Sequence, residues 1–293
     1  MRSIVLSRIQ GSIEASPRLL EATRTALAIT EQVLPIGNRR ITRNFRMFSP
    51  CSAGTARSRA ALTILAANQT FPLLLELLSR TGRSIEAPVP IETYSDNGFK
   101  KAAAERLQEL CDHYGSDKAR HGYHLLYGPL LAGRESIAAV LEIGLGTNNV
   151  DVVSNMGSSG RPGASLRAFR DFLPQAQIFG GDVDRRVLFA EDRISTFFVD
   201  QTKPESFAGL AKAVDGIEFD LIIDDGLHSP NANLATLLFG LDRLRIGGSL
   251  VVEDIAPSAL PLWQLVAALL PLSYEAHVIA AKKAFVFQVR RLA

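Results

Sequence analysis

The second half of the chain alternates short apolar runs with amphipathic segments, and this alternation constrains the fold most. The runs "AAVLEIG", "QIFGGDV", "RISTFFVD", "FDLIIDD" and "GSLVVED" predict strands, and stretches such as "ASLRAFRDFL" and "NANLATLLFGLDRLR" between them predict helices. Strands separated by helices need crossover connections, which give a mainly parallel α/β sheet covered on both faces. The closing runs "YEAHVIAA" and "KAFVFQVRRL" are too close for a crossover, so an antiparallel C-terminal strand is expected.

The first part of the chain differs in charge and in pattern. Residues 1–60 contain ten arginines and three glutamates, a net charge of 10 − 3 = +7. Segments up to about residue 80 read as helices, and the Pro- and Gly-containing stretch that follows reads as a linker. We therefore expect a helical N-terminal extension and linker over residues 1–95 and a second domain over residues 96–293. An Arg-rich, acid-poor start is also found in transit peptides, and this alternative stays open.

Composition sets the broad class of the protein. The chain is 47% hydrophobic and 21% charged, which is ordinary for a globular protein, and the net charge of +2 gives no indication of a nucleic-acid partner. Two cysteines, Cys51 and Cys111, do not make a disulfide framework, so a reducing, cytoplasmic location is expected. The apolar stretch "AALTILAANQTFPLLLELL" is interrupted by polar residues and proline, which predicts a buried helix and no membrane span.

Each strand of the predicted parallel sheet ends beside an acidic residue. The segments at these ends read "EIGLGTNN", "GDVD", "VDQ", "DDGLH" and "EDI". In an open parallel α/β sheet, ligands bind outside the carboxyl ends of the strands. Polar residues are common in loops, but that explanation accounts poorly for five such ends. We therefore predict a ligand site along this edge.

The first of these segments carries a Gly-x-Gly turn that departs from a dinucleotide fingerprint. Gly144 and Gly146 permit a tight turn and the close approach of a ligand. A dinucleotide site needs a third glycine that opens directly into a helix, whereas a long loop here postpones the helix until about Ala164. Glu142 can accept a hydrogen bond from a ligand ammonium, and Asp182 can bind both hydroxyls of a ribose. This pair fits a nucleoside with an amino-acid tail.

These motifs together resemble a known family. "E-x-G-x-G", an acid that ends the second strand, "DDGLH" and "GGSLVVED" look like those of class I S-adenosylmethionine-dependent methyltransferases. "SDKARHGYHLLYGPLL" and "GASLRAF" resemble, more narrowly, the metal-dependent branch that methylates sugar hydroxyls of macrolide antibiotics. The resemblance covers about residues 110–293 and implies the Rossmann-like sheet of that class. The loop between Gly146 and Gly163 is longer than the family's usual turn.

The resemblance implies a cofactor site for S-adenosylmethionine. The residues carried over are Glu142, Gly144, Gly146, Ser165, Asp182, Asp200, Gln201 and Asp224. The first three would line the methionine part, and Ser165 would hold its carboxylate at a helix N-terminus. Asp182 would bind the ribose, and Asp200 with Gln201 would face the adenine. Asp224 would either contact the cofactor or orient the site from behind it.

The resemblance also implies a metal and a base. Asp225, Glu253 and Asp254 would hold a divalent cation, and His228 would act as the general base, with Asp225 part of the catalytic machinery. Oxygen ligands suit magnesium or another hard cation, which can lower the pKa of a bound hydroxyl. An imidazole that titrates near neutral pH is a suitable base. In the alternative interpretation, these are ordinary strand-end, helix-cap and loop residues.

The predicted activity is therefore methyl transfer to a hydroxyl of a sugar, glycoside or other polyhydroxylated small molecule. A nicotinamide-dependent oxidoreductase and a non-catalytic methyltransferase-like binding domain are the alternatives. The missing third glycine disfavours the first alternative, and the intact acid set disfavours the second. His121, Tyr123 and Tyr127 are expected in the core or in a lid. The N-terminal segment is expected to cap the site or to contribute to a homo-oligomer.

Overall fold

A computed structural model of the chain describes residues 36–51 and 55–293. The part of the predicted helical extension over residues 1–35, and with it the transit-peptide alternative, lies outside these residues. The chain divides into two compact units, Met1–Leu77 and Leu78–Ala293. Each unit is described by itself.

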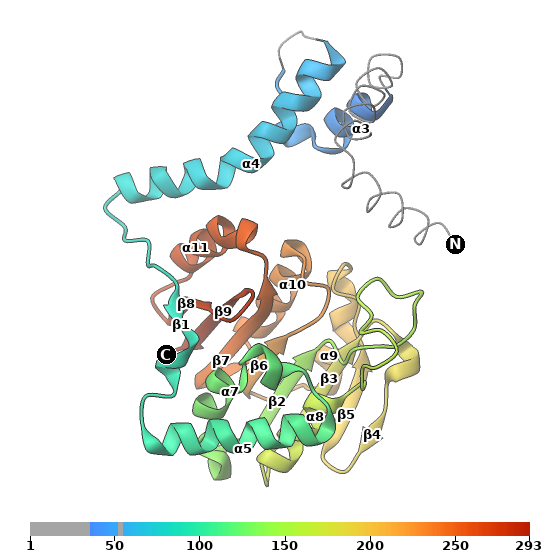
Figure 1. Cartoon of the computed structure of the whole chain (residues 1–293), viewed down its shortest axis with the longest axis vertical. Coiled ribbons are helices and arrows are strands. Elements are labelled where there is room, and N and C mark those ends of the chain that lie inside the picture. Colours follow the sequence, from blue (N-terminus) through green and yellow to red (C-terminus); the bar gives the residue numbers. More distant parts are fainter. Residues whose placement is uncertain (1–35, 52–54) are drawn as a thin grey trace, which may run out of the picture. The chain divides into compact units, whose positions relative to one another are not determined.

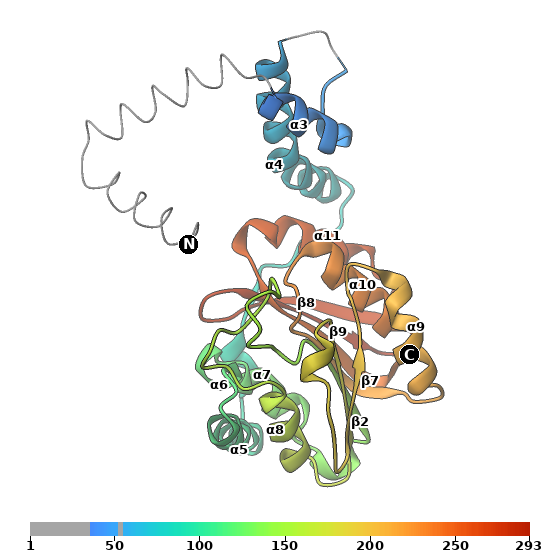
Figure 2. The ribbon, with the colours of Figure 1, turned by 90° about the vertical axis from the view of Figure 1, so that its right-hand side faces the viewer.

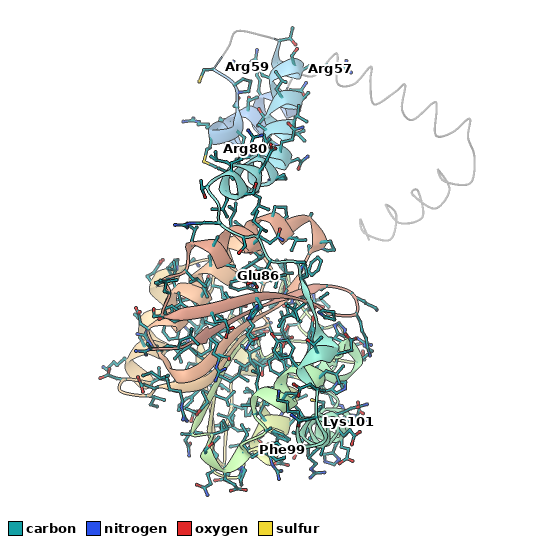
Figure 3. All side chains as sticks on the ribbon, turned by 90° about the vertical axis from the view of Figure 1, so that its left-hand side faces the viewer. Arg57, Arg59, Arg80, Glu86, Phe99 and Lys101 are labelled. Atoms are coloured by element: carbon teal, nitrogen blue, oxygen red, sulfur yellow. The ribbon has the colours of Figure 1, made fainter. Side chains whose placement is uncertain are left out.

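The described part of the first unit is helical. It contains α3 (Ile36–Asn44), a short 3-10 turn η1 (Arg46–Phe48) and most of α4 (Ala56–Arg80), which runs across the boundary between the units. Figure 3 shows Arg57 and Arg59 near the start of α4 and Arg80 at its end.

Helix α4 contains the apolar stretch that we expected to be buried, and this expectation is wrong. Only Ala60 and Thr63 of this helix are buried in the described structure. Helix α4 is long and apolar enough to cross a membrane by length and composition, a test that core helices and signal sequences also pass. Among its leucines, Leu62, Leu65, Leu73, Leu74 and Leu77 are exposed.

The second unit is built on one sheet, whose strand order is β1-β8-β9-β7-β6-β2-β3-β5-β4 within the described residues (Figures 1 and 2). The strands are β1 (Val89–Pro90), β2 (Ala139–Ile143), β3 (Gln177–Asp182), β4 (Ala190–Glu191), β5 (Ile194–Phe198), β6 (Phe219–Asp224), β7 (Leu244–Ile255), β8 (Tyr274–Ala280) and β9 (Phe285–Arg291). Strand β9 runs antiparallel to both β7 and β8, and β4 runs antiparallel to β5, whereas the other pairs are parallel. The predicted fold, mainly parallel with an antiparallel C-terminal strand, is confirmed.

Helices cover both faces of this sheet, as Figure 1 shows. One face carries α5 (Gly98–Tyr114), α6 (Lys118–His121), α7 (His124–Leu130) and α8 (Ala164–Phe172), and the other carries α9 (Phe207–Ala213), α10 (Pro230–Leu241) and α11 (Leu260–Leu269). Short 3-10 turns lie at Ile91–Tyr94, Arg134–Ser136, Arg185–Val187, Pro204–Ser206 and Pro257–Ala259. Strand side chains alternate between the two layers, so Val140 packs with Leu126 and Phe169, and Leu141 packs on the opposite face.

The second unit begins earlier than residue 96, the boundary that we expected. Strand β1, inside the predicted linker, pairs in parallel with β8, and Ile91 is 1% exposed in the core. Two prolines concealed this strand, since proline is tolerated only at the edge of a sheet. Strand β1 is such an edge strand.

Helix α5 is closed at both ends by residues suited to a cap. Asn97 caps its start by accepting a hydrogen bond from the Lys100 amide, and Gly115 ends it in the left-handed conformation. Phe99 is 68% exposed (Figure 3). The buried residues are Ala104, Leu107, Leu110 and Cys111. Phe99 lies in the first turn, ahead of the first of these buried residues.

Candidate active site

Two cavities lie at the carboxyl ends of the central strands, beside the point where the strand order reverses between β2 and β6. The first, which we name the acid cavity, has a volume of about 370 Å³, and Lys118, Asp225, His228, Glu253 and Asp254 are among its lining residues. The second, the turn cavity, has a volume of about 410 Å³, and Gly144, Asp182, Asp200, Gln201 and several valines are among its lining residues. Gly144, Gly146, Ser154, Asp225 and Gly226 line both. The two cavities therefore meet at the turn after β2.

Two glycines bring the backbone segments at this junction close together. Gly144 has φ of 103°, and a Cβ there would lie 2.1 Å from the carbonyl oxygen of Asp225. A Cβ on Gly226 would lie 2.0 Å from Oε1 of Gln201. A side chain at Gly144 would separate the ends of β2 and β6, and one at Gly226 would displace the side chain of Gln201, so the two glycines set the width of the site.

The carboxylate of Asp182 shapes the turn that follows β2. Its Oδ2 accepts from the Leu145 amide at 2.8 Å, and its Oδ1 accepts from the Asp184 amide at 2.8 Å. Burial raises the pKa of Asp182 despite these backbone bonds. Each carboxylate oxygen has two lone pairs, so acceptor capacity remains for a ribose diol in the turn cavity. The ribose role of Asp182 stays a prediction that this geometry permits.

Gln201 and Asp224 form a buried pair behind the turn cavity. The Gln201 amide donates to Asp224 Oδ1 at 2.9 Å, and its own oxygen accepts from the Leu227 amide at 2.9 Å. Asp224 is fully buried, which raises its pKa, and it lines neither cavity. This position favours the orienting role for Asp224 over direct cofactor contact. Asp200 lines the turn cavity, and hydrogen bonding to Thr202 lowers its pKa.

Glu142 lies just behind the acid cavity. It is fully buried and lines neither cavity, whereas its partner Ser165, at the start of α8, lines the acid cavity. The Ser165 hydroxyl donates to Glu142 Oε2 at 2.6 Å, and the Lys118 ammonium lies 2.9 Å from Oε1. Burial raises the pKa of Glu142, and Lys118 opposes this rise. A ligand ammonium can therefore contact Glu142 only if Lys118 gives up part of its contact with this carboxylate. The role of Glu142 in ligand binding stays a prediction.

Lys118 is a buried cation at the acid cavity that the sequence motifs did not single out. It is 2% exposed, and its Nζ lies 2.6 Å from Asp225 Oδ2, 2.8 Å from Glu253 Oε1 and 2.9 Å from Glu142 Oε1. Burial lowers the pKa of Lys118, but the surrounding carboxylates outweigh this and hold it well above its ordinary value. One ammonium therefore joins the ends of β2, β6 and β7.

The predicted metal ligands and base come together on the other side of the acid cavity. Ligand atoms of Asp225, His228 and Asp254 all lie within 4.8 Å of one another. His228 Nε2 is 3.8 Å from Asp225 Oδ1 and 3.8 Å from Asp254 Oδ2. Glu253 stands apart from this group because it accepts hydrogen bonds from Lys118 and Tyr127, and burial beside Asp225 holds its pKa well above its ordinary value. The donor set suits a hard divalent cation, with Asp225 and Asp254 as the best-placed ligands.

Two residues of this group are held in strained backbone conformations. His228 and Asp254 each have φ of 53°, in the left-handed region that residues other than glycine rarely adopt. Such conformations cost about 1–3 kcal/mol each and cluster at functional sites. The two strained residues mark the acid cavity as a candidate functional site independently of any sequence motif.

Two tyrosines expected in the core or in a lid hold the acid set in place. The Tyr123 hydroxyl donates to Asp254, and the Tyr127 hydroxyl donates to Glu253. Both rings are buried at the junction of α6 and α7. The sequence signal for Lys118 and both tyrosines was the segment "SDKARHGYHLLYG", in which polar groups stand at positions that the fold buries.

The strand order, the crossover helices and the acidic edge fit the class I methyltransferase fold that the motifs resemble. No family model matches the chain. The chain is 33% identical over 161 residues to the 8-demethyl-8-alpha-L-rhamnosyl tetracenomycin-C 2'-O-methyltransferase of Streptomyces olivaceus, an alignment that covers 54% of this chain and 40% of the relative. It is 33% identical over 162 residues to the L-olivosyl-oleandolide 3-O-methyltransferase of Streptomyces antibioticus, which covers 53% of this chain and 38% of the relative. The resemblance to sugar O-methyltransferases is thereby confirmed.

A solved structure is also similar over part of the chain. The MycE methyltransferase of mycinamycin biosynthesis, in complex with Mg and SAH, has a TM-score of 0.49 and 23% identity, and the match covers 64% of this chain and 54% of that one. The chain thus matches about two fifths of the length of the two curated relatives above and about half of MycE.

Proposed function

We propose that the chain is an S-adenosylmethionine-dependent O-methyltransferase of the cytoplasm. Its acceptor is a hydroxyl of a sugar, glycoside or other polyhydroxylated small molecule, and a divalent cation, magnesium first, assists the reaction. One observation carries the proposal: the turn cavity and the acid cavity adjoin each other and share Gly144 and Asp225 in their linings. A donor in the first cavity and a hydroxyl in the second would face each other across that junction. The curated relatives, which are sugar O-methyltransferases by name, support the acceptor class.

The turn cavity suits the nucleoside end of the donor. Its volume of about 410 Å³ is in the range of small-ligand pockets, and its valines offer an apolar surface to a base. Asp182 offers its remaining lone pairs to ribose hydroxyls, and Asp200 and Gln201 stand at the adenine end. At the adjoining acid cavity, Ser165 and the start of α8 would contact the methionine carboxylate, with the Ser165 hydroxyl turned from Glu142 to the ligand. When bound, the donor supplies a methyl group on a positively charged sulfur.

The acid cavity suits the acceptor and its proton. A divalent cation held by Asp225 and Asp254 would lower the pKa of an acceptor hydroxyl. The Nε2 atom of His228 would take the hydroxyl proton while the oxygen forms its bond to the methyl carbon and the carbon–sulfur bond breaks. Tyr123 fixes the Asp254 carboxylate by hydrogen bonding, so the ligand stays oriented during this step. The products are a methyl ether and S-adenosylhomocysteine.

A metal-supplemented screen against sugars, glycosides and catechols tests the proposal. Release of S-adenosylhomocysteine should appear with at least one polyhydroxylated acceptor and should stop when a chelator is present. Thermal shifts separate the main alternative, because a ligand that binds the native state raises its melting temperature. S-adenosylhomocysteine should raise it, and NAD should not. Stabilisation by NAD alone would replace this proposal with an oxidoreductase.

A further inference from the structure

The ammonium of Lys118 is a resident cation inside the site proposed for a divalent cation. It contacts Asp225, which the proposal makes a metal ligand, at 2.6 Å, and the neighbouring acid Glu253 at 2.8 Å. Its side chain is 3% exposed, so water contributes little to its solvation and the carboxylates provide most of it. A cation on Asp225 must therefore share that carboxylate with an ammonium in direct contact with it.

Like charges at such short distances repel strongly, and burial weakens screening. We propose that Lys118 competes with the divalent cation for Asp225, and so sets the metal affinity while it keeps the acids assembled without metal. Metal binding would draw Asp225 away from the ammonium and leave Glu142 and Glu253 as its partners. This inference rests on the proposed function, because it presupposes a metal at Asp225 and Asp254.

The local geometry supports competition over a purely structural role. Tyr127 already gives Glu253 a hydrogen bond, and Ser165 gives one to Glu142, so both acids have neutral partners besides the ammonium. Lys118 contacts acids from three neighbouring strand ends and also lines the acid cavity itself.

Manganese titration of the full chain tests this without any turnover assay. Electron paramagnetic resonance or calorimetry measures the Mn²⁺ dissociation constant of the wild type and of Lys118→Met, with no cofactor or acceptor present. Lys118→Met should bind Mn²⁺ at least about tenfold more tightly, or ~1.4 kcal/mol. Lys100→Met is the matched control: it removes the same charge from an exposed side chain on α5 and should leave the constant unchanged.

A second variant guards against misfolding of the first, since Lys118→Met leaves buried carboxylates unpaired. The wild-type cluster of Lys118 with Glu142, Asp225 and Glu253 has a formal charge of +1 − 3 = −2. The double variant Lys118→Met/Glu142→Gln keeps −2, from Asp225 and Glu253, and should fold with the competitor removed. Tighter Mn²⁺ binding by the folded double variant supports the proposal, because its cluster has the same net charge as the wild type.

Unchanged or weaker Mn²⁺ binding by the folded double variant overturns it. Titration of the wild type with S-adenosylhomocysteine distinguishes failure of the Lys118 competition from failure of the proposed function. If S-adenosylhomocysteine binds while the Mn²⁺ constant does not respond to Lys118, only the competition is refuted. If neither S-adenosylhomocysteine nor Mn²⁺ binds the wild type, the proposed function fails as well.

Discussion

The turn cavity and the acid cavity share a junction but are built in opposite ways. In the turn cavity, the carboxylate of Asp182 already accepts two backbone hydrogen bonds. In the acid cavity, the carboxylates of Glu142, Asp225 and Glu253 contact the ammonium of Lys118, Asp254 lies beside His121 and His228, and two residues have strained backbones. The first cavity suits a neutral ribose and base, whereas the second holds negative charge that a further cation would offset.

Loss of a metal ligand should give the largest effect. Asp225→Asn keeps the size of the side chain but removes its charge, so we expect acceptor turnover to fall to background. S-adenosylhomocysteine affinity, measured by calorimetry, should change little because Asp225 is not among the proposed polar contacts of the cofactor. Excess chelator on the wild type should reproduce this pattern, and added magnesium should reverse it. Full activity in excess chelator would mean that His228 acts as base without a metal.

His228→Ala comes next in size. Loss of a general base should lower kcat by roughly 10²–10⁴, because such a group contributes about that much. The Mn²⁺ dissociation constant should stay near the wild-type value if Asp225 and Asp254 are the metal ligands. His277→Ala is a matched control, since that imidazole pairs with Glu86 and Glu275 away from both cavities. Loss of Mn²⁺ binding in His228→Ala would make this residue a ligand instead of a base.

Asp182→Ala should have a smaller effect, and it falls in the turn cavity. The substitution removes the carboxylate that accepts hydrogen bonds from the Leu145 and Asp184 amides and, in the proposal, from the ribose. S-adenosylhomocysteine binding should therefore weaken by about 1–3 kcal/mol. The melting temperature should also fall, because the carboxylate holds the turn together. Calorimetry and thermal unfolding measure the two effects separately. Asp200 lines the same cavity, and its carboxylate contacts Thr202 and Lys203, so Asp200→Ala provides a comparison within that cavity. Unchanged S-adenosylhomocysteine affinity in Asp182→Ala would remove the ribose assignment.

The sequence predicted the sheet well because its signal is local. A buried parallel strand reads as a short apolar run, and each of the seven predicted strands is present in the described structure. Strand β1 was missed because two residues beside a proline carry no periodicity, and it exists only through its pairing with β8. Strand β4, a two-residue pairing at the other edge, was missed for the same reason.

The sequence predicted which strand ends form the site, but it did not predict which side chains contact one another there. Asp225, His228 and Asp254 meet because parallel strands end at one edge, a consequence of topology that the sequence reveals. The Lys118 contacts depend on how α6 packs against three strands, which no residue spacing fixes. Glu253 was expected to join the other metal ligands, but its partners Lys118 and Tyr127 lie more than a hundred residues away in sequence.

Removal of residues 1–80 should have the smallest effect on the two cavities. It tests whether the helical unit contributes to acceptor turnover or to oligomerisation. A chain that starts at Thr81 retains all of β1 and both cavities, so S-adenosylhomocysteine affinity should match that of the full chain. If the helical unit caps the acceptor or links protomers, this chain should lose acceptor turnover or change its oligomeric state. Enzyme assay and light scattering measure these outcomes. A match to the full chain in both would leave residues 1–80 without a role in the reaction.

A second start at Ser95 provides the control, because it also removes β1. Ile91 is 1% exposed, and burying such a side chain stabilises a fold by about 1.5–3 kcal/mol. The hydroxyl of Tyr94 donates to Gln288 on β9 at 2.6 Å, and this bond is lost as well. The chain from Ser95 should therefore unfold at lower denaturant concentration than the chain from Thr81. Equal stability of the two would show that β1 is a dispensable edge, and the boundary of the catalytic unit would then lie near residue 96 after all.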